Sequence, residues 1–585
     1  MTFIDWFILF FYLIFSLVLG IYISLKNHNE ADYFVAGRRL NGLLAGMSMA
    51  ATTFSIDTPL YVAGIIGTRG LAGNWEWWSF GLAHVAMTVI FAPLWRRSGV
   101  LTDAAFTELR YGGRAAAYLR GIKAFLLSVP INCIGIGYAF LAMRKVAESL
   151  GVVDGHIVFG PFTDTILLMI LVALFLLVYT VLGGLWAVVI NDFVQLVLAL
   201  LGAFAVCFVA LDASGGMTDL LTKLEALDRP ELLSLFPWTL NKNGFNWLDS
   251  SGISITTFFA FISLQWWSFR RSDGGGEFIQ RLLATKDEKQ ATLAGIVFLI
   301  INYLVRSWLW ILVGLAGLVL LPQQTDWELS YPNLAVKYLP PVGLGLVVVS
   351  LVAAFMSTVS TSINWGASYL AHDLYKRFVR PSAGARETIF MGQIASILLL
   401  LIGVLTALFS NSIGSMFRLV IAIGTGPGAV LVLRWFWWRV NALVELSAML
   451  SGFFIGLITS VSPYFMIEDF GKRLLFTTSF SAVIWLLTLF FTKPESDETL
   501  NEFVKQVNPP GPGWKKIRKT LNIDPVDSLS TLGSRFLLGS GILYGGLVTI
   551  GAFLLHQEMS AWIALSISVS CVFLIKKTRL NNSII

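Results

Sequence analysis

The chain is built from long apolar blocks separated by short polar or charged breaks. A helix needs about 20 apolar residues to cross a bilayer. Fifteen blocks meet that need, at about 4–25, 45–66, 76–95, 119–143, 163–183, 185–210, 254–283, 290–320, 341–371, 388–409, 413–433, 441–464, 473–492, 536–555 and 559–575. Only 13% of the residues are charged, which excludes a large soluble enzyme. We therefore predict an all-α polytopic membrane protein with about 15 transmembrane helices.

Lysine and arginine are distributed unevenly between the predicted loops. With the N-terminus outside and the C-terminus inside, the inside loops carry about three times as many of them as the outside loops. Arg281 is counted in an inside loop, whereas Arg270, Arg271, Arg306 and Arg418 lie within or near the membrane and are left unassigned. This bias explains the net charge of +6 without nucleic acid as a partner. We expect the partners to be membrane lipid and a small-molecule solute, and the oligomeric state stays open.

Two of the predicted helices contain polar interruptions. In the helix at 45–66 they are Thr52, Thr53, Ser55, Asp57, Thr58 and Pro59, and in the helix at 254–283 they are Ser272, Asp273 and Gly274–Gly276. Broken helices at matching positions, five helices apart, are typical of a five-plus-five inverted repeat whose unwound turns meet near the middle of the membrane and bind a solute. The alternative is that Pro and Gly are simply common in transmembrane helices.

The predicted inverted repeat divides the chain into five parts. Residues 1–40 form an extra helix and the first inside loop, and residues 41–440 form the repeat core, with repeats at 41–211 and 254–440 joined by an outside loop at 212–253. Four extra helices follow the core. Two of these accessory helices lie at 441–492 and two at 535–585, and a cytoplasmic linker at 493–534 joins the pairs.

Three carboxylates fall within the predicted membrane region, at Asp57, Glu76 and Asp192. A charge at the bilayer centre costs at least about 2.5–3.5 kcal/mol, so each residue needs a compensating role. That role is either a functional site or a buried ion pair or hydrogen bond.

Small hydroxyls cluster on the helix at 341–371. Ala354, Ser357, Thr358 and Thr361 recur at the spacing of one helical face. Such a face serves either close helix packing or a site for a hard cation that prefers oxygen ligands. Taken alone, the pattern favours packing.

Several motifs together resemble the sodium/solute symporter family. They are Asp32–Arg38, Gly183–Ala187 followed by Asp192–Gln195, Gln280–Ala284, and Met356–Ser362 leading into Asp373–Lys376. The resemblance covers residues 1 to about 490. It implies a leucine-transporter-type inverted-repeat fold, Na⁺ as the coupling ion, alternating access, and no enzymatic activity.

The resemblance also implies ion sites. A first Na⁺ site would use the backbone carbonyls of Ala51, Phe54 and Ala354 and the hydroxyls of Ser357 and Thr358. A second site, present in some members, would fall on Asp192, Ser357, Ser360 and Thr361. One or two sodium ions are therefore expected.

Candidate solute-binding residues are Asp57, Thr58, Glu76, Ser79, Arg270 and Arg271. Glu76 and Ser79 resemble the hydroxyl-binding stretch of sugar-transporting members, which favours a sugar or polyol. Thr58 departs from the glutamine found in a galactose transporter. Arg270 and Arg271 would favour an anionic solute if they lie within the membrane, and are ordinary inside charges if they do not.

The sequence therefore predicts a Na⁺-coupled symporter that imports a small organic solute through a bacterial cytoplasmic membrane. A sugar or polyol is favoured, and a carboxylate or amino acid is possible. The alternatives are a ligand-sensing receptor with a transporter-like bundle and an H⁺-coupled carrier that uses Asp57 or Asp192.

Overall fold

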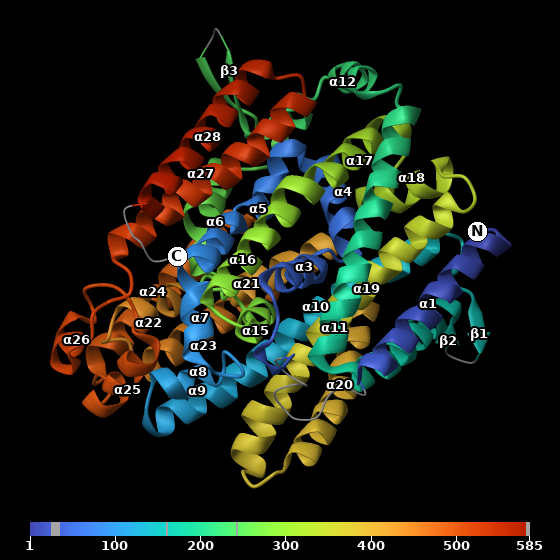
Figure 1. The fold of residues 1–585 in the computed structure, drawn as a ribbon. Coiled ribbons are helices and arrows are strands. Elements are labelled where there is room, and N and C mark those ends of the chain that lie inside the picture. The colour runs from blue at the N-terminus through green and yellow to red at the C-terminus, as the bar shows by residue number, and fades with distance from the viewer. Residues whose placement is uncertain (25–35, 160–161, 242–243, 581–585) are drawn as a thin grey trace.

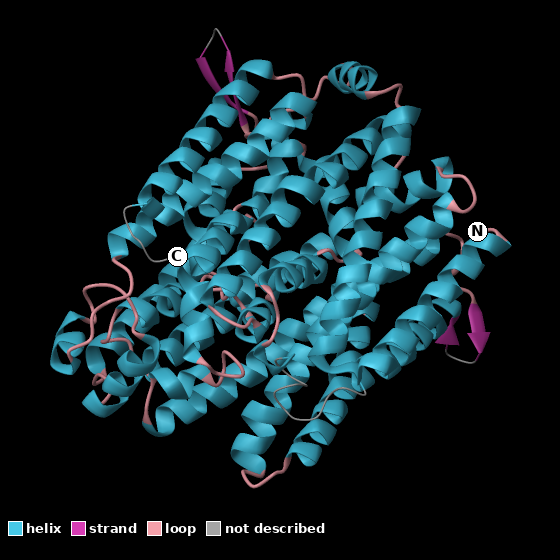
Figure 2. Cartoon of the chain, in the orientation of Figure 1, coloured by secondary structure: helices cyan, strands magenta, loops and turns pink. Residues whose placement is uncertain are grey.

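The computed structural model describes residues 1–24, 36–159, 162–241 and 244–580 and consists of closely packed helices with two short hairpins (Figures 1 and 2). The β3–β4 hairpin and α12 lie at one end of the bundle, which we call the hairpin end. Helices α25 and α26 lie at the other end, which we call the α25 end. Most of the Asp32–Arg38 motif, residues 32–35, falls outside the described residues.

The elements follow one another in chain order. The first part contains α1 (Phe3–Ser24), η1 (Ala36–Arg38), α3 (Gly42–Thr53), α4 (Asp57–Arg69), η2 (Leu71–Asn74), α5 (Trp75–Trp78), α6 (Phe80–Ala86), η3 (Met87–Phe91), α7 (Ala92–Ser98), α8 (Phe106–Arg110), α9 (Gly113–Leu126), η4 (Leu127–Ile131), α10 (Asn132–Ser149), β1 (Ile157–Phe159), β2 (Phe162–Thr163) and α11 (Asp164–Ala213).

The middle part contains α12 (Met217–Glu225), η5 (Pro230–Leu232), β3 (Trp238–Asn241), β4 (Gly244–Trp247), η6 (Asp249–Ser251), α13 (Ile255–Ala260), η7 (Phe261–Gln265), α14 (Trp266–Ser268), α15 (Gly276–Ala284), α16 (Glu288–Leu299), η8 (Ile300–Val305), α17 (Arg306–Leu320), η9 (Trp327–Leu329), α18 (Ser330–Tyr338), α19 (Gly343–Ser368) and η10 (Tyr369–Val379). The last part contains α20 (Ala385–Leu408), α21 (Ile413–Gly424), α22 (Gly428–Phe436), α23 (Ala442–Val461), α24 (Phe470–Phe491), α25 (Asp497–Val507), α26 (Lys515–Leu521), α27 (Leu529–Leu554) and α28 (Glu558–Leu580). Both hairpins are antiparallel.

All fifteen predicted segments are helical. Among the described residues, 11 helices are long and apolar enough to cross a membrane, or up to 12 if the bent pair α3 and α4 counts as one span. The predicted helices at 163–183 and 185–210 both fall within α11, of which only Val188–Ala213 is long and apolar enough to count as a crossing. The predicted helices at 254–283 and 413–433 do not count as crossings either, because each is interrupted.

The two predicted interruptions are present, and a third accompanies them. Helices α3 and α4 meet at a bend of 55° after Thr53, and the second interruption separates α14 from α15. The third separates α21 from α22 and was not predicted. The Arg270 amide donates to the Gly424 carbonyl at 2.8 Å, and the Gly426 amide donates to the Ser268 carbonyl at 2.9 Å. The last two breaks thus satisfy each other's backbone groups, which an apolar environment requires.

Glycines make the second interruption possible. Gly274 and Gly275 have φ angles of 137° and 91°, a region that residues with a Cβ rarely adopt. A Cβ on the neighbouring Gly276 would overlap the Trp365 ring of α19. The glycine run therefore permits both the turn and the close approach of α15 to α19.

The segment at 493–534, predicted as a cytoplasmic linker, contains two helices. It folds into α25 and α26, which pack at the α25 end of the bundle. Phe503 and Trp514 are fully buried there, and the Trp514 indole donates to the Trp435 carbonyl at 2.8 Å. Further along the chain, α27 contacts the core through Tyr544, whose hydroxyl donates to the Trp78 carbonyl at 2.7 Å.

Candidate functional site

The hydroxyl face of α19 packs against the first broken helix. Ser357, Ser360 and Thr361 are at most 1% exposed, and Thr358 is 8% exposed. The Thr358 hydroxyl donates to the Thr52 carbonyl at 2.9 Å, within the last turn of α3. The stripe therefore faces the interior of the protein and touches the helix end where carbonyls are released from helical bonding.

The five atoms expected to hold the first ion come from these two adjoining segments. Ala51 and Phe54 belong to the end of α3 and its cap, whereas Ala354, Ser357 and Thr358 follow one face of α19. All five residues are buried. Beyond Thr53 the chain leaves the helix at Phe54, whose ψ is 74°. Carbonyl and hydroxyl oxygens, which are ligand types suited to Na⁺, thus occur on two segments that touch at Thr52 and Thr358.

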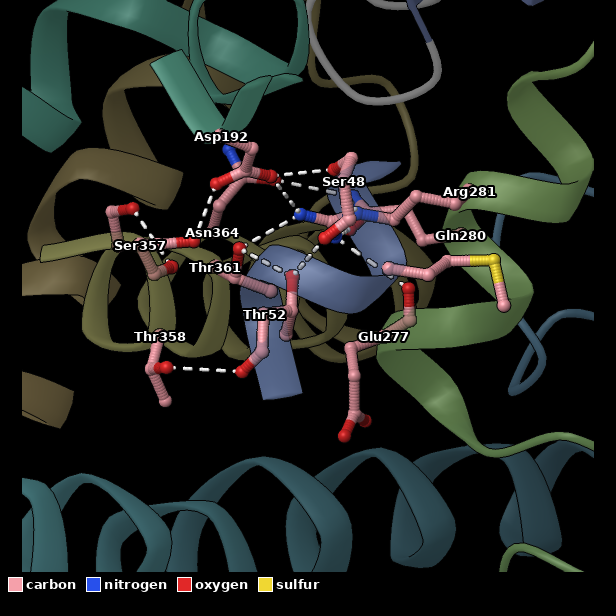
Figure 3. Close-up of polar contacts among 12 residues, drawn as sticks. Ser48, Thr52, Asp192, Glu277, Gln280, Arg281, Ser357, Thr358, Thr361 and Asn364 are labelled. Atoms are coloured by element: carbon pink, nitrogen blue, oxygen red, sulfur yellow. Dashed lines mark hydrogen bonds and ion pairs between the residues drawn. The ribbon is translucent and has the colours of Figure 1, made fainter. Parts of the chain in front are cut away.

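Asp192 lies at the centre of a polar cluster between α11, α3 and α19 (Figure 3). Its carboxylate accepts hydrogen bonds from Ser48 and, at 2.6 Å, from Ser357. Arg281 of α15 lies 3.5 Å away through one guanidinium nitrogen. Neither charged side chain is more than 1% exposed, so the pair is enclosed entirely by protein.

Arg281 also binds the hydroxyl face directly. Its guanidinium donates to the Thr361 hydroxyl at 2.7 Å and to the Ser48 hydroxyl at 3.2 Å. The Gln280 side chain accepts another bond from it at 3.1 Å. The guanidinium therefore contacts two of the four residues expected to form the second ion site, Asp192 and Thr361.

A second buried arginine flanks the other side of the α3 end. Arg306, at the start of α17, donates to the Ala50 carbonyl at 3.1 Å and to the Thr53 hydroxyl at 2.9 Å. Its guanidinium also lies 5.0 Å from the centre of the Trp310 ring. A cation beside the C-terminal carbonyls of a half-helix is electrostatically favourable.

A third cluster surrounds Glu76 of α5. This carboxylate is fully buried and accepts a hydrogen bond from the Tyr61 hydroxyl at 2.8 Å. Arg69 and Arg418 both form ion pairs with it, and the Arg418 Nε lies 3.0 Å from one carboxylate oxygen. Two guanidinium groups thus share one carboxylate, and the cluster connects α4, α5 and α21.

Residues 33–452 match the model of the sodium:solute symporter family. The chain belongs to this family. Among curated relatives, it is 25% identical to a sodium/glucose cotransporter of Vibrio parahaemolyticus over 85% of this chain and 92% of that one. It is also 25% identical to the high-affinity proline transporter PutP of Bacillus subtilis over 74% of this chain and 88% of that one.

A solved structure has the same fold as this symporter. It is the substrate-bound, outward-open state of a Na⁺-coupled sialic acid symporter, with a TM-score of 0.65 and 20% identity over 85% of this chain and 99% of that one. The predicted leucine-transporter-type fold and the multi-pass membrane location are therefore confirmed. Membership of a family of transporters also supports the prediction that the protein is not an enzyme.

The symporter places the expected solute residues in different surroundings. Asp57 is buried and accepts a bond from Ser55, and the Thr58 hydroxyl donates to the Thr53 carbonyl at 3.4 Å. Glu76 has the three partners described above. The Ser79 hydroxyl is buried without a hydrogen-bond partner in the described part of the chain.

Arg270 and Arg271 lie in the second interruption of the symporter. Arg270 is 8% exposed and its guanidinium lies 5.9 Å from the centre of the Trp365 ring. Arg271 pairs with Glu277 of α15. Arg270 also borders a cavity with Lys123, Asp273, Arg434 and Glu445. These two arginines therefore do not lie in a surface loop.

Sequence reasoning missed the contacts of Arg281. It counted this residue among the basic residues of an inside loop, whereas the structure places it against Asp192 in the interior. The available signal was position, since Arg281 falls five residues after Gly276, in the second half of a broken helix that must continue across the protein. Arg306 and Arg418 had been left unassigned, near the membrane.

Proposed function

We propose that this symporter imports a small organic solute together with Na⁺ by alternating access across a bacterial cytoplasmic membrane, with its N-terminus outside. Na⁺ binds to the carbonyls of Ala51, Phe54 and Ala354 and the hydroxyls of Ser357 and Thr358. The observation that supports this site is the 2.9 Å contact of the Thr358 hydroxyl with the Thr52 carbonyl. It places the α19 hydroxyls at the carbonyl end of a half-helix.

The chemistry of this position favours a monovalent cation. The carbonyl end of a helix carries partial negative charge, and unwound carbonyls coordinate Na⁺ in transporters built on broken helices. Neutral hydroxyls and carbonyls bind the ion without adding a carboxylate. In our proposal, the ion draws the α3 end and α19 together, and its departure releases them.

The ion gradient supplies the driving force. One elementary charge moving across 100 mV contributes about 2.3 kcal/mol, and each tenfold concentration gradient contributes about 1.4 kcal/mol. A single Na⁺ is thus enough to concentrate a neutral solute by about two to three orders of magnitude under those conditions.

A second Na⁺ at Asp192, Ser357, Ser360 and Thr361 competes with Arg281. The guanidinium lies within 3.5 Å of the Asp192 carboxylate and donates to Thr361. Two cations close to one carboxylate repel each other. We therefore propose one ion in the arrangement described here and a second only when Arg281 withdraws.

Uptake by reconstituted vesicles tests the proposal. Replacing Ser357 or Thr358 by Ala removes one ion ligand, and we expect the Na⁺ concentration for half-maximal uptake to rise roughly tenfold or more. Ser350→Ala is the matched control, because Ser350 lies on the same helix, is buried, and donates to its own helix at Val347. An unchanged Na⁺ requirement in both site variants contradicts the proposal.

The same vesicles separate the alternatives. Uptake driven by a pH gradient without added Na⁺ selects the H⁺-coupled carrier. Ligand binding without any translocation selects the receptor. Solute identity needs a separate argument, because the named relatives carry a sugar and an amino acid.

A further inference from the structure

An open cavity at the hairpin end leads from the surface to the Glu76 cluster. The cavity has a volume of about 440 Å³ and is lined by Tyr61, Arg69, Lys145, Glu328 and Arg418, among others. A neighbouring opening is lined by Gly252, Thr257 and Arg473. The two openings share Arg69, Asn411, Ser412 and Arg418. We call the joined space the vestibule.

The two shared arginines have donor capacity that the protein does not use. A guanidinium group carries five N–H donors. Within the described part of the chain, Arg418 donates to Glu76 only through Nε, and Arg69 only through one terminal nitrogen. Their side chains are 28% and 17% exposed. The remaining donors are therefore available in the vestibule.

The local charge also favours an anion. Within the Glu76 cluster itself, one carboxylate faces two guanidinium groups, which leaves one positive charge there. The wider lining adds Lys145 and Arg473 against Asp326, Glu328, Glu468 and Asp469, so the favourable charge for an anion is local to Arg69 and Arg418. Guanidinium groups bind carboxylates through paired, charge-assisted hydrogen bonds. A sugar hydroxyl gains much less from such a site.

Three of the four acidic residues that line the vestibule already have partners. Glu328 accepts from Lys145 at 2.6 Å and from the Gly414 amide at 3.0 Å, and Asp326 also accepts from Lys145. Asp469 accepts from Ser254, Thr257 and the Lys472 amide. Their acceptor positions are therefore taken, unlike the donors of Arg69 and Arg418. Glu468 completes the acidic lining and is exposed.

The cluster is also joined to two of the three broken helices, the first and the third. Tyr61 lies on α4, immediately after the first break, and Arg418 lies on α21, immediately before the third. The Tyr61 ring lies 4.8 Å from that of Phe417. A solute bound to Arg418 thus contacts the helices that border the interruptions.

We propose that Arg418, assisted by Arg69, binds the carboxylate of the transported solute, so that the substrate is a small organic carboxylate. Glu76 holds both guanidinium groups in place before the solute arrives. The inference rests on the proposed function, because it assigns the solute of that same symporter. It departs from the sugar or polyol that Glu76 and Ser79 had favoured.

Thermal unfolding of the purified full-length protein in detergent tests this assignment. In NaCl, the protein is titrated with three matched pairs: gluconate and glucose, lactate and lactamide, and proline and prolinamide. We expect at least one carboxylate to raise the unfolding temperature and its neutral partner to have no effect. A panel in which neutral members act as well as the carboxylates, or in which no carboxylate acts, overturns the proposal.

Variants identify the residue responsible. Arg418→Gln leaves Glu76 with one arginine and Tyr61, so the buried carboxylate keeps a balanced partner. We expect the apparent affinity for the active carboxylate to weaken roughly tenfold or more, with a smaller loss for Arg418→Lys. Arg473→Gln is the matched control, because Arg473 also lines the vestibule but its donors reach the Ile467 carbonyl at 2.6 and 2.9 Å. Unchanged affinity in both Arg418 variants contradicts the assignment.

Sodium alone distinguishes this proposal from the proposed function. Without solute, Na⁺ should stabilise the wild-type protein and Arg418→Gln equally, and should stabilise Thr358→Ala much less. A wild-type protein that does not respond to Na⁺ contradicts Na⁺ coupling, whatever the carboxylates do. A normal Na⁺ response with no carboxylate response contradicts only the solute assignment.

Discussion

Arg281 and Asp192 are the residues on which the number of bound ions depends. They are opposite charges buried together, with hydroxyls of Ser48, Ser357 and Thr361 completing the cluster. Removing one partner from a buried ion pair typically costs about 3–5 kcal/mol, because the other charge is left uncompensated. A sodium ion is a possible replacement for the lost guanidinium, since Asp192 already lies among hydroxyl oxygens.

We therefore expect Arg281→Gln to lower the unfolding temperature in Na⁺-free buffer and to recover much of it in NaCl, with a larger Na⁺-dependent shift than the wild type. Arg434→Gln is the control. Arg434 is equally buried and pairs with Asp273 and Glu445. Within the described part of the chain these carboxylates accept from Trp435, Lys123 and the Tyr111 hydroxyl but from no serine or threonine, so salt should not restore this variant. A Na⁺-dependent shift that returns to the wild-type size in the double variant Arg281→Gln, Asp192→Asn assigns the recovery to Asp192. A shift no larger than that of the wild type rules out a second ion site.

At the scale of elements, local signals predicted the breaks unequally. The glycine run at 274–276 predicted an interruption, because two of its residues need positive φ. The break between α21 and α22 was missed, although Gly426 and Pro427 mark it in the sequence, because they lie inside an otherwise apolar block. The helical spacing of Ser and Thr predicted the hydroxyl face of α19, but only the family resemblance predicted that this face contacts the end of α3. The contact of Arg281 with Asp192 is non-local, so loop charge counting could not find it.

The contact between α15 and α19 gives a test at this scale. Gly276→Ala places a methyl group against the Trp365 ring, and overpacking of this kind costs about 1–3 kcal/mol. We expect a lower unfolding temperature and slower uptake, because α15 carries Arg281. Gly384→Ala is the control, since a Cβ there meets nothing within 4 Å. Equal behaviour of the two variants contradicts the tight contact.

At the scale of the whole molecule, the family match ends at residue 452, and the C-terminal part lies beyond it. Helix α25 has an apolar stripe at Leu500, Phe503, Val504 and Val507, all buried. This i, i+3, i+4, i+7 spacing is a helical signal that the Pro and Gly content of the segment obscured. The surface that the stripe covers is built from α7, α8 and α22, so its partner was not readable from the segment alone.

Trp514 tests whether this segment is an integral part of the fold. Its ring contacts Phe503 at 5.3 Å between centroids, lies 4.9 Å from the Arg110 guanidinium, and its indole donates to the Trp435 carbonyl. Trp514→Ala removes a fully buried ring, and such a change costs about 3–5 kcal/mol. We expect a lower unfolding temperature and faster proteolysis within residues 493–534. Trp562→Ala on α28 is the matched control, because that side chain is 59% exposed. If both tryptophan variants unfold and are cleaved alike, α25 and α26 are loosely attached to the bundle. The segment packed against Trp435 then does not stabilise the break between α21 and α22.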